Sequence, residues 1–535
     1  MKFDYVVIGA GSAGCAVASR LSESGKYTVA VLEAGPKDSS PWIHIPVGYF
    51  KTMGNPRSDW RYVAQPDPGL NGRAIPWPRG RVLGGSSSIN GLLYVRGQSQ
   101  DFDHWRQLGN AGWSWNDVVP YFTRSETWHG ETGAKDSSRG TSGPLSVSPT
   151  ALKRTVVDHW IDAAVAAGYK KNPDYNHGEQ EGVGYFQLTL KNGQRCSAAT
   201  AYLKPARKRK NLSIITDTQV ERLIVIDGRV ARIVAQSNGQ RVEFEVGCET
   251  ILSAGAIGSP QILMVSGIGA GKDLSPLGIK VSKELPGVGK NLQDHLQARP
   301  IFKTDLSTIN TEANSLFKQA MIAMQYAVTR TGPMTMAASL GTGFLKTNPD
   351  LETPDIQFHI QPFSANNAIE GTHAFSAFTA SVLQLRPEST GHLELKSSDI
   401  NVHPSIHPNY LATKNDQETI VKGIQIARKI STFNPLKAHI TEEFAPGRKI
   451  ALDDEAGILE WARNTAVTIY HPTGTCKMGS DDMSVVNERL KVHGIKGLRV
   501  ADASIMPTIT SGNTNAPSIM IGEKAADMIL EDAAQ

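Results

Sequence analysis

A glycine-rich turn near the start of the chain, with an acidic residue about 20 positions further on, has the composition of a dinucleotide-binding site. The turn has the spacing G-x-G-x-x-G, with Gly9, Gly11 and Gly14 as its glycines, and the acidic residue is Glu33. In such a site the first glycine forms a tight turn, the second lets backbone approach a pyrophosphate, and the third lets a helix pack closely on the sheet. Glu33 is placed to accept hydrogen bonds from a ribose and would repel a 2′-phosphate. The pattern predicts a bound dinucleotide and leaves open whether it carries nicotinamide or flavin.

The segments around this turn must hold it in place, and their patterns predict a strand, a helix and a second strand. Residues 3–8 and 27–32 are short apolar runs rich in β-branched residues, as in buried parallel strands. Residues 15–24 carry apolar side chains on one side, as an amphipathic helix does. Two further strands are expected at 242–246 and 250–254, and the second of them returns to the same sheet.

The middle of the chain has a different pattern of apolar and polar residues. Alternating runs at 356–360 and 377–385 predict an antiparallel sheet. We therefore expect an α/β protein, in which a Rossmann-like nucleotide-binding domain carries an inserted α+β substrate domain built on an antiparallel sheet. The predicted nucleotide-binding parts are 1–150, with a loop cover at 59–97, then 206–297 and 464–535; the predicted substrate-domain parts are 151–205 and 298–463.

Length and composition exclude several classes of protein. A chain of 535 residues is expected to form more than one domain, and its net charge of +4 gives no case for binding nucleic acid. The densest basic run, residues 204–210, is best interpreted as a solvated loop or helix end, with a patch for anionic lipid or a nuclear address as alternatives. No apolar run is long enough for a membrane span, and no secretory leader is expected before the first strand. The four cysteines form no C-x-x-C pair, so we expect reduced thiols, a cytoplasmic location and no metal site.

Five longer segments resemble the signatures of the glucose–methanol–choline (GMC) oxidoreductases. They are Gly80 to Asn90, Gly255 to Gly269, Gly289 to His295, His471 to Gly479 and Asp502 to Ser504. The resemblance spans nearly the whole chain and implies that the dinucleotide is FAD. Some members attach FAD covalently through a histidine at the position that Ile89 occupies here. The resemblance therefore implies non-covalent FAD.

The same resemblance implies which residues form the site. His471 is expected to be the catalytic base, because imidazole has a pKa near the operating pH. Asn513 is expected to hold the substrate oxygen through its amide, and Asn515 to lie at the flavin edge. The residues expected to bind FAD are Gly9, Gly11, Ser12, Ala13, Gly14, Glu33, Ala34, Trp60, Arg81, Val82, Gly84, Gly85, Ser86, Asn90, Gly91, Leu92, Leu93, Val220, Ala254, Tyr470, Asp502, Ala503, Thr514 and Asn515.

Four other histidines are expected to lie outside the site, and one leucine is expected to disfavour choline as the substrate. His295, His359, His392 and His407 are interpreted as packing or surface histidines. Choline-handling relatives carry a glutamate in a segment where this sequence is expected to place Leu340. An unpaired cation is poorly held against leucine, so a neutral alcohol or sugar is favoured over choline.

The resemblance thus implies an FAD-dependent dehydrogenase that oxidises a primary alcohol or a sugar such as sorbose and passes electrons to a quinone-type acceptor. An alcohol oxidase that reduces O₂ to H₂O₂ and an FAD-containing hydroxynitrile lyase remain alternatives. A flavin-binding protein without catalysis is disfavoured by the His471–Asn513 pair. The substrate, the oligomeric state and any contact with a membrane surface stay open.

Overall fold

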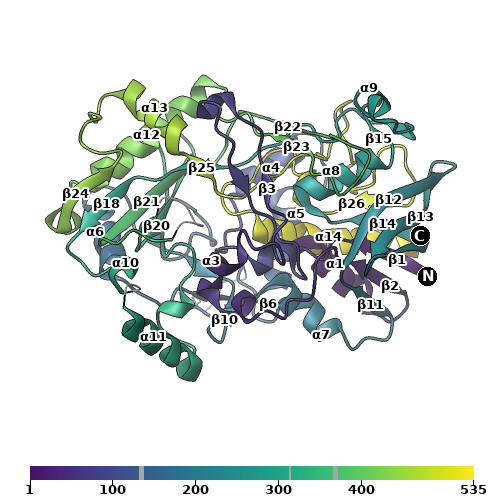
Figure 1. Cartoon of the computed structure of the whole chain (residues 1–535), viewed down its shortest axis with the longest axis horizontal. Coiled ribbons are helices and arrows are strands. Elements are labelled where there is room, and N and C mark those ends of the chain that lie inside the picture. Colours follow the sequence, from purple (N-terminus) through teal and green to yellow (C-terminus); the bar gives the residue numbers. More distant parts are fainter. Residues whose placement is uncertain (132–137, 313–314, 366–370) are drawn as a thin grey trace.

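Two sheets, one mostly parallel and one antiparallel, form the body of the molecule (Figure 1). The computed structural model describes residues 1–131, 138–312, 315–365 and 371–535. In the first sheet, neighbouring parallel strands are β11 (Leu212–Ile215), β2 (Val29–Leu32), β1 (Lys2–Ile8), β14 (Gln240–Leu252) and β26 (Leu498–Val500). The antiparallel pair β12 (Thr218–Ile226) and β13 (Arg229–Ser237) extends it beyond β14. The Rossmann-like part of the predicted fold is confirmed.

The predicted glycine-rich turn leads from β1 directly into helix α1 (Ser12–Leu21). This helix begins three residues before the expected start, because Gly11 already serves as its N-cap. Gly9 has a φ of 98°, a conformation that side chains disfavour, and a Cβ atom there would lie 2.5 Å from the Ser253 carbonyl oxygen. A Cβ atom on Gly14 would lie 2.0 Å from the Gly9 carbonyl oxygen. Both glycines are therefore required by the close approach of helix and sheet.

Strand β14 replaces two strands that were expected separately, at 242–246 and 250–254. Its first half pairs antiparallel with β13, from Gln240 to Glu245, and its second half pairs parallel with β1, from Glu245 to Leu252. One continuous strand thus joins the antiparallel extension to the parallel core. Helix α14 (Asn515–Ala534) lies against α1, and both chain ends lie at this side of the molecule (Figure 1).

The second sheet is antiparallel, as predicted. Its order is β24 (Ile440–Ala445), β18 (Ile301–Thr304), β21 (Ala377–Gln384), β20 (Ile356–Gln361), β19 (Gly341–Leu345) and β7 (Gly182–Tyr185). Two short strands, β17 (Leu296–Ala298) and β25 (Val467–Thr468), join at β21. Helices α12 (Lys414–Ile430), α13 (Glu455–Thr465) and α6 (Thr155–Ala166) belong to the same part. Strand β25 comes from a segment assigned to the other domain, and the predicted domain limits stay a prediction.

Between the two sheets runs a covering segment with little regular structure. It contains the small pair β3 (Tyr62–Val63) and β4 (Pro76–Trp77) and the 3₁₀ turn η3 (Gly85–Ser88). Within the described part of the chain, no helix has the length and apolar character needed to cross a membrane.

Candidate active site

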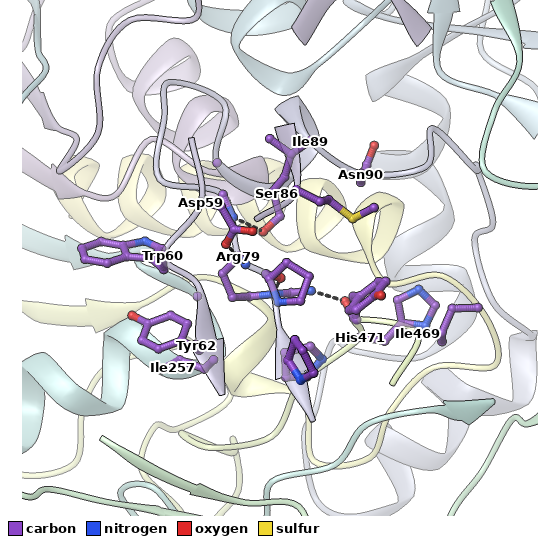
Figure 2. A pocket seen from close by; sticks show the side chains of 18 of the residues that line it. Asp59, Trp60, Tyr62, Arg79, Ser86, Ile89, Asn90, Ile257, Ile469 and His471 are labelled. Atoms are coloured by element: carbon purple, nitrogen blue, oxygen red, sulfur yellow. Dashed lines mark hydrogen bonds between the residues drawn. The ribbon is translucent and has the colours of Figure 1, made fainter. Parts of the chain in front are cut away.

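A cavity of about 1100 Å³ runs from the glycine-rich turn to the second sheet. Figure 2 shows Trp60, Tyr62 and Ile257 toward one side of the view and Ile469 and His471 toward the other, with Ser86, Ile89 and Asn90 above them. The cavity is large enough for a dinucleotide and a small substrate together, because ligand pockets for drug-sized molecules start at about 300 Å³. One wall of the cavity comes from the first sheet and the other from the second sheet, and the two walls carry different chemical groups.

The nucleotide end of the cavity is made mainly of backbone. It is lined by Gly9, Gly11, Ser12, Ala13 and Glu33. Glu33 is 5% exposed and accepts hydrogen bonds at 2.9 Å from the backbone N–H groups of Ala10 and Gly35. Burial raises the pKa of Glu33 to about 7, against the effect of these two N–H donors. A ribose hydroxyl would add a further donor to this carboxylate, as the sequence predicts.

Two helix N-termini meet in the middle of the cavity. The Ser12 hydroxyl, at the start of α1, donates to Oδ1 of Asn515, at the start of α14, over 2.7 Å. Each N-terminus offers unpaired N–H groups and a partial positive charge. The phosphates of a dinucleotide and an electron-rich flavin ring both suit such ends. The turn, the paired helix ends and the cavity volume therefore fit FAD.

Asp502 fixes the chain at the floor of this region. Its carboxylate accepts from the backbone N–H of Gly255 at 2.8 Å, the hydroxyl of Ser259 at 2.6 Å and the backbone N–H of Ser504 at 2.8 Å. These contacts join the start of helix α8 (Gly255–Val265) to the turn η8 (Ala503–Ile505). Asp502 lines the cavity and also holds the backbone around it.

Most of the residues expected to bind FAD line this one cavity. Those that line it are Gly9, Gly11, Ser12, Ala13, Glu33, Ala34, Trp60, Gly85, Ser86, Asn90, Gly91, Leu93, Val220, Ala254, Tyr470, Asp502, Ala503, Thr514 and Asn515. Those outside its lining are Gly14, Arg81, Val82, Gly84 and Leu92. Gly84, with a φ of 93°, lies in the turn next to the lining residue Gly85, and the others are neighbours of lining residues or pack behind them. Contact of each residue with FAD stays a prediction.

The expected catalytic pair is adjacent at the other end of the cavity. The Asn513 amide Nδ2 lies 3.0 Å from Nε2 of His471, and both residues line the cavity. The backbone N–H of His471 donates to Asp294 at 2.7 Å, and the Thr468 hydroxyl donates to the same carboxylate at 2.5 Å. The hydroxyl of Tyr410 donates to it as well. Burial raises the pKa of Asp294 to about 6, and the hydrogen bonds oppose this shift.

His295 makes the contact that sequence reasoning missed. Its Nε2 lies 2.8 Å from the carbonyl oxygen of Leu385, and its Nδ1 lies 3.0 Å from Nδ1 of His471. A carbonyl only accepts, so Nε2 of His295 carries a hydrogen and donates. In a neutral ring, Nδ1 of His295 then accepts, and the hydrogen in that contact belongs to Nδ1 of His471. Nε2 of His471 is left with its lone pair facing the Asn513 amide and the cavity.

Burial keeps these rings neutral. It lowers the pKa of His295 to about 4 and lowers that of His471 well below its ordinary value, with repulsion from His295, His359 and Arg79 adding to the effect on His471. A neutral imidazole with a free Nε2 is the form that can accept a proton. His471 thus has the protonation state that a base needs, and its catalytic role stays a prediction.

His359, expected to be a packing or surface histidine, is a third buried ring at this end. It lies on β20 and lines the cavity, and burial lowers its pKa to about 3. Its Nδ1 lies 3.4 Å from the Ser339 hydroxyl, and Nε2 has no hydrogen-bond partner among the described atoms. No local spacing marks His295 or His359, because their partners lie far away in the sequence. His392 and His407 lie on the strands β22 (His392–Glu394) and β23 (Ser405–His407), outside the cavity lining, with their rings stacked at 4.7 Å.

The expectation for Leu340 is wrong. Leu340 is fully buried in the core beside the second sheet and does not line the cavity. The preceding residues Ala338 and Ser339 line it instead. The charge at the substrate end of the cavity is therefore set by residues other than Leu340.

Comparisons with known proteins agree with this geometry. The GMC oxidoreductase family matches residues 3–297 through its N-terminal part and residues 387–522 through its C-terminal part. An alcohol dehydrogenase [acceptor] of Pseudomonas putida is 38% identical over 531 residues, which are 99% of this chain and 96% of that protein. An oxygen-dependent choline dehydrogenase of Rhizobium rhizogenes is 40% identical over 536 residues, with the same coverage.

A solved structure also matches the fold over the whole chain. A variant of formate oxidase from Aspergillus oryzae, solved for its FAD modification, superposes with a TM-score of 0.92 and 27% identity, over 100% of this chain and 99% of that chain. The family match and the named relatives determine the class of chemistry, and the cavity is large enough for FAD. The chain belongs to the GMC oxidoreductase family and is an FAD-binding flavoprotein of the alcohol-oxidising class.

Proposed function

We propose that this protein is an FAD-dependent dehydrogenase that oxidises the primary hydroxyl of a neutral alcohol or sugar. The observation that supports this most directly is the chain of hydrogen bonds from Leu385 through His295 to His471 and Asn513. It leaves Nε2 of His471 without a hydrogen, so its lone pair, which faces the Asn513 amide in this structure, can accept a proton from a hydroxyl that the same amide holds.

FAD, when bound, supplies the acceptor for the hydride that leaves the carbinol carbon. The protein's own groups handle the oxygen. Nε2 of His471 accepts the hydroxyl proton, and the Nδ2 group of Asn513 donates to the oxygen as negative charge develops there. The Nε2 group of Gln357 lies 3.4 Å from Oδ1 of Asn513 and orients that amide. His471 is only 7% exposed, and Asn513 beside it is half-buried.

The charges on the cavity wall favour a neutral substrate over choline. Among the described lining residues, the only carboxylates are Glu33, Asp59 and Asp502, and all three lie on the first sheet or on the covering segment. The second-sheet part of the lining carries instead Arg299, a half-buried cation. A quaternary ammonium would lack an anionic partner there and would meet a like charge.

Two further parts of the proposal follow from the covering segment and the cysteines. Ile89 lies at the cavity and offers no nucleophile, so FAD should be released unmodified when the protein is denatured.

The four cysteines bear on where the protein works. Cys15, Cys196 and Cys476 are buried and free, and Cys248 is half-buried and free, which suits the reducing cytoplasm.

An anaerobic screen of alcohols and sugars, read as bleaching of the flavin absorbance, tests this proposal. A primary alcohol or a sugar such as sorbose should bleach the flavin, and choline should do so poorly. Dye reduction in excess of H₂O₂ formation supports a quinone-type acceptor, and a stoichiometric H₂O₂ yield would show an oxidase instead. A flavin that stays oxidised with every alcohol, while cyanohydrins are cleaved, would replace the proposal with a lyase.

A further inference from the structure

Helix α11 (Leu316–Thr329) presents a stripe of large apolar side chains to solvent. The residues of this stripe are Leu316, Phe317, Met321, Met324 and Val328, and they are 84, 73, 56, 69 and 79% exposed. From Phe317 onward they are spaced four, three and four residues apart, which places them on one face of the helix. Soluble proteins scatter large exposed apolar side chains, and a contiguous set marks a surface that something covers.

The opposite side of the helix holds it to the protein. Tyr326 is buried and its hydroxyl donates to the Gly193 carbonyl oxygen at 3.0 Å, while Ile322 is half-buried. The apolar stripe therefore points away from the body. In Figure 1, α11 projects from the second-sheet part at the lower edge of the molecule.

The charges around the stripe are positive. Lys318 is the only charged residue on the helix, and Arg330 follows at its C-terminus; both are exposed. The sequence contains no aspartate or glutamate between Glu312 and Asp350. The carboxylate of Glu312 is itself paired with Arg154 at 2.8 Å. No free acidic group in this stretch would oppose an anionic surface.

A second basic group lies on the same edge. The run 204–210 begins with the short helix α7 (Lys204–Ala206), which Figure 1 also places at the lower edge, together with α11. Lys204, Arg207, Lys208 and Lys210 are exposed. These exposed cations add positive charge to the side of the molecule that lies lowest in Figure 1.

The size of the stripe favours lipid over a second copy of the chain. A helix of 14 residues is about 21 Å long and about 10 Å wide, so its footprint is roughly 200 Å². A stable dimer needs about 800 Å² on each partner. A bilayer has no such minimum, because each inserted side chain contributes independently and cationic residues add attraction to anionic lipids.

We propose that α11 is a membrane-binding helix, which lies in the interface of an anionic bilayer with its stripe in the acyl region. Lys318, Arg330 and the basic run 204–210 meet the lipid headgroups. Ala338 and Ser339, nine and ten residues beyond the end of the helix, line the cavity, so the chain leads from α11 directly to a cavity wall. Apolar alcohols and quinones, which partition into lipid, would then reach the enzyme from the bilayer. The binding itself is independent of which alcohol is oxidised.

Flotation of the purified holoenzyme with phospholipid vesicles tests the proposal. The wild type should float with vesicles of phosphatidylcholine and phosphatidylglycerol, and less with phosphatidylcholine alone. A variant with Phe317→Ser and Met324→Gln should bind on the order of 100-fold more weakly, since each large apolar side chain withdrawn from lipid weakens partitioning by about tenfold. The matched control has Leu452→Gln and Met483→Gln, which are 47 and 40% exposed elsewhere, and should float like the wild type. FAD content and melting temperature verify that every variant is folded.

Failure of the wild type to float, or equal flotation of the α11 variant and the wild type, would overturn the proposal. So would a wild-type dimer in lipid-free sedimentation that the α11 variant alone dissociates, because a second copy would then cover the stripe. Loss of flotation in the α11 variant with full flotation of the control supports it. A weaker, salt-sensitive loss in a Lys208→Glu and Lys210→Glu variant supports the role of the basic run.

Discussion

The two walls of the cavity are built in different ways. The wall from the first sheet presents backbone: a turn that Gly9 and Gly14 allow, two helix N-termini, and N–H groups that hold Glu33 and Asp502. The wall toward the second sheet presents side chains, among them His359, Gln361 and Arg299, and His471 and Asn513 lie where the walls meet. A wall of backbone suits a cofactor shared by a whole family, and a wall of side chains can change with the substrate. Substitutions on the two walls should accordingly fail in different ways.

The largest effect is expected on the first wall. Gly14→Val should abolish FAD binding, because its side chain would overlap the Gly9 carbonyl, 2.0 Å from the position of a Cβ atom. The measurement is the flavin absorbance that remains with the protein after gel filtration. Gly228→Asn is the control, since it lies in an open turn at a φ of 72° that asparagine tolerates. A yellow Gly14→Val protein would show that the turn does not need this close approach.

The next effect is expected at the junction of the walls. His471→Ala should slow anaerobic flavin reduction by about 10²–10⁴-fold, the usual contribution of a general base. The variant should keep its FAD, unlike Gly14→Val. His407→Ala, on the surface strand β23, is the matched control and should leave the rate unchanged. An unchanged rate in His471→Ala would remove this residue from the mechanism.

The pH dependence of flavin reduction in the wild type tests the protonation state of His471. The pKa of His471 is lowered by burial and the base acts in its neutral form, so activity should persist below pH 6.5. It should fall only when the pH drops through the lowered pKa. An acid limb at or above pH 6.5 in the rate of flavin reduction would show that His471 is solvated and its pKa ordinary.

A smaller effect is expected for the residue that orients His471. His295→Ala should lower the rate by about 10- to 100-fold, as does loss of other groups that fix a functional histidine. At low pH, where His295 is itself protonated, the substitution also removes its repulsion of a protonated His471, so the pKa of His471 should rise and the acid limb should move to higher pH. His295→Gln, which keeps an acceptor for Nδ1–H of His471, should recover part of the rate. A lower rate with an unmoved acid limb would mark His295 as a packing residue only.

The smallest effect is expected on the second wall. Arg299→Gln should raise the ratio of choline to neutral-alcohol turnover by about fivefold, because removal of one like charge relieves ~1 kcal/mol at a partly screened distance. Lys414→Gln, an exposed cation on α12, is the control. An unchanged ratio would show that the guanidinium does not face the substrate.

The sequence predicts the first wall far better than the second. The glycine turn and Glu33 lie within one local unit, so their spacing alone determines their geometry. The error of three residues at the start of α1 arose because apolar periodicity marks the buried turns of a helix and not its first N–H groups. The two strands expected within β14 proved to be one, because a strand that changes partner along its length has no marker in the sequence.

His295 could not be identified as part of the site from the sequence. Its contact with His471 spans 176 residues and depends on the pairing of β17 with β21 and β25. No periodicity or spacing encodes such a pairing. Leu340 was misplaced for a related reason, because a one-residue shift in an irregular segment exchanges a cavity position for a core position.

The hydrogen bond between Ser12 and Asn515 joins the first helix of the chain to the last. During synthesis, the glycine turn and Glu33 leave the ribosome early, yet the partner helix that completes the cofactor site emerges 503 residues later. A nascent chain therefore carries a recognisable nucleotide motif that cannot yet enclose its ligand. We therefore expect FAD to load only after the whole polypeptide is complete, and a chain truncated before residue 515 should leave the ribosome colourless.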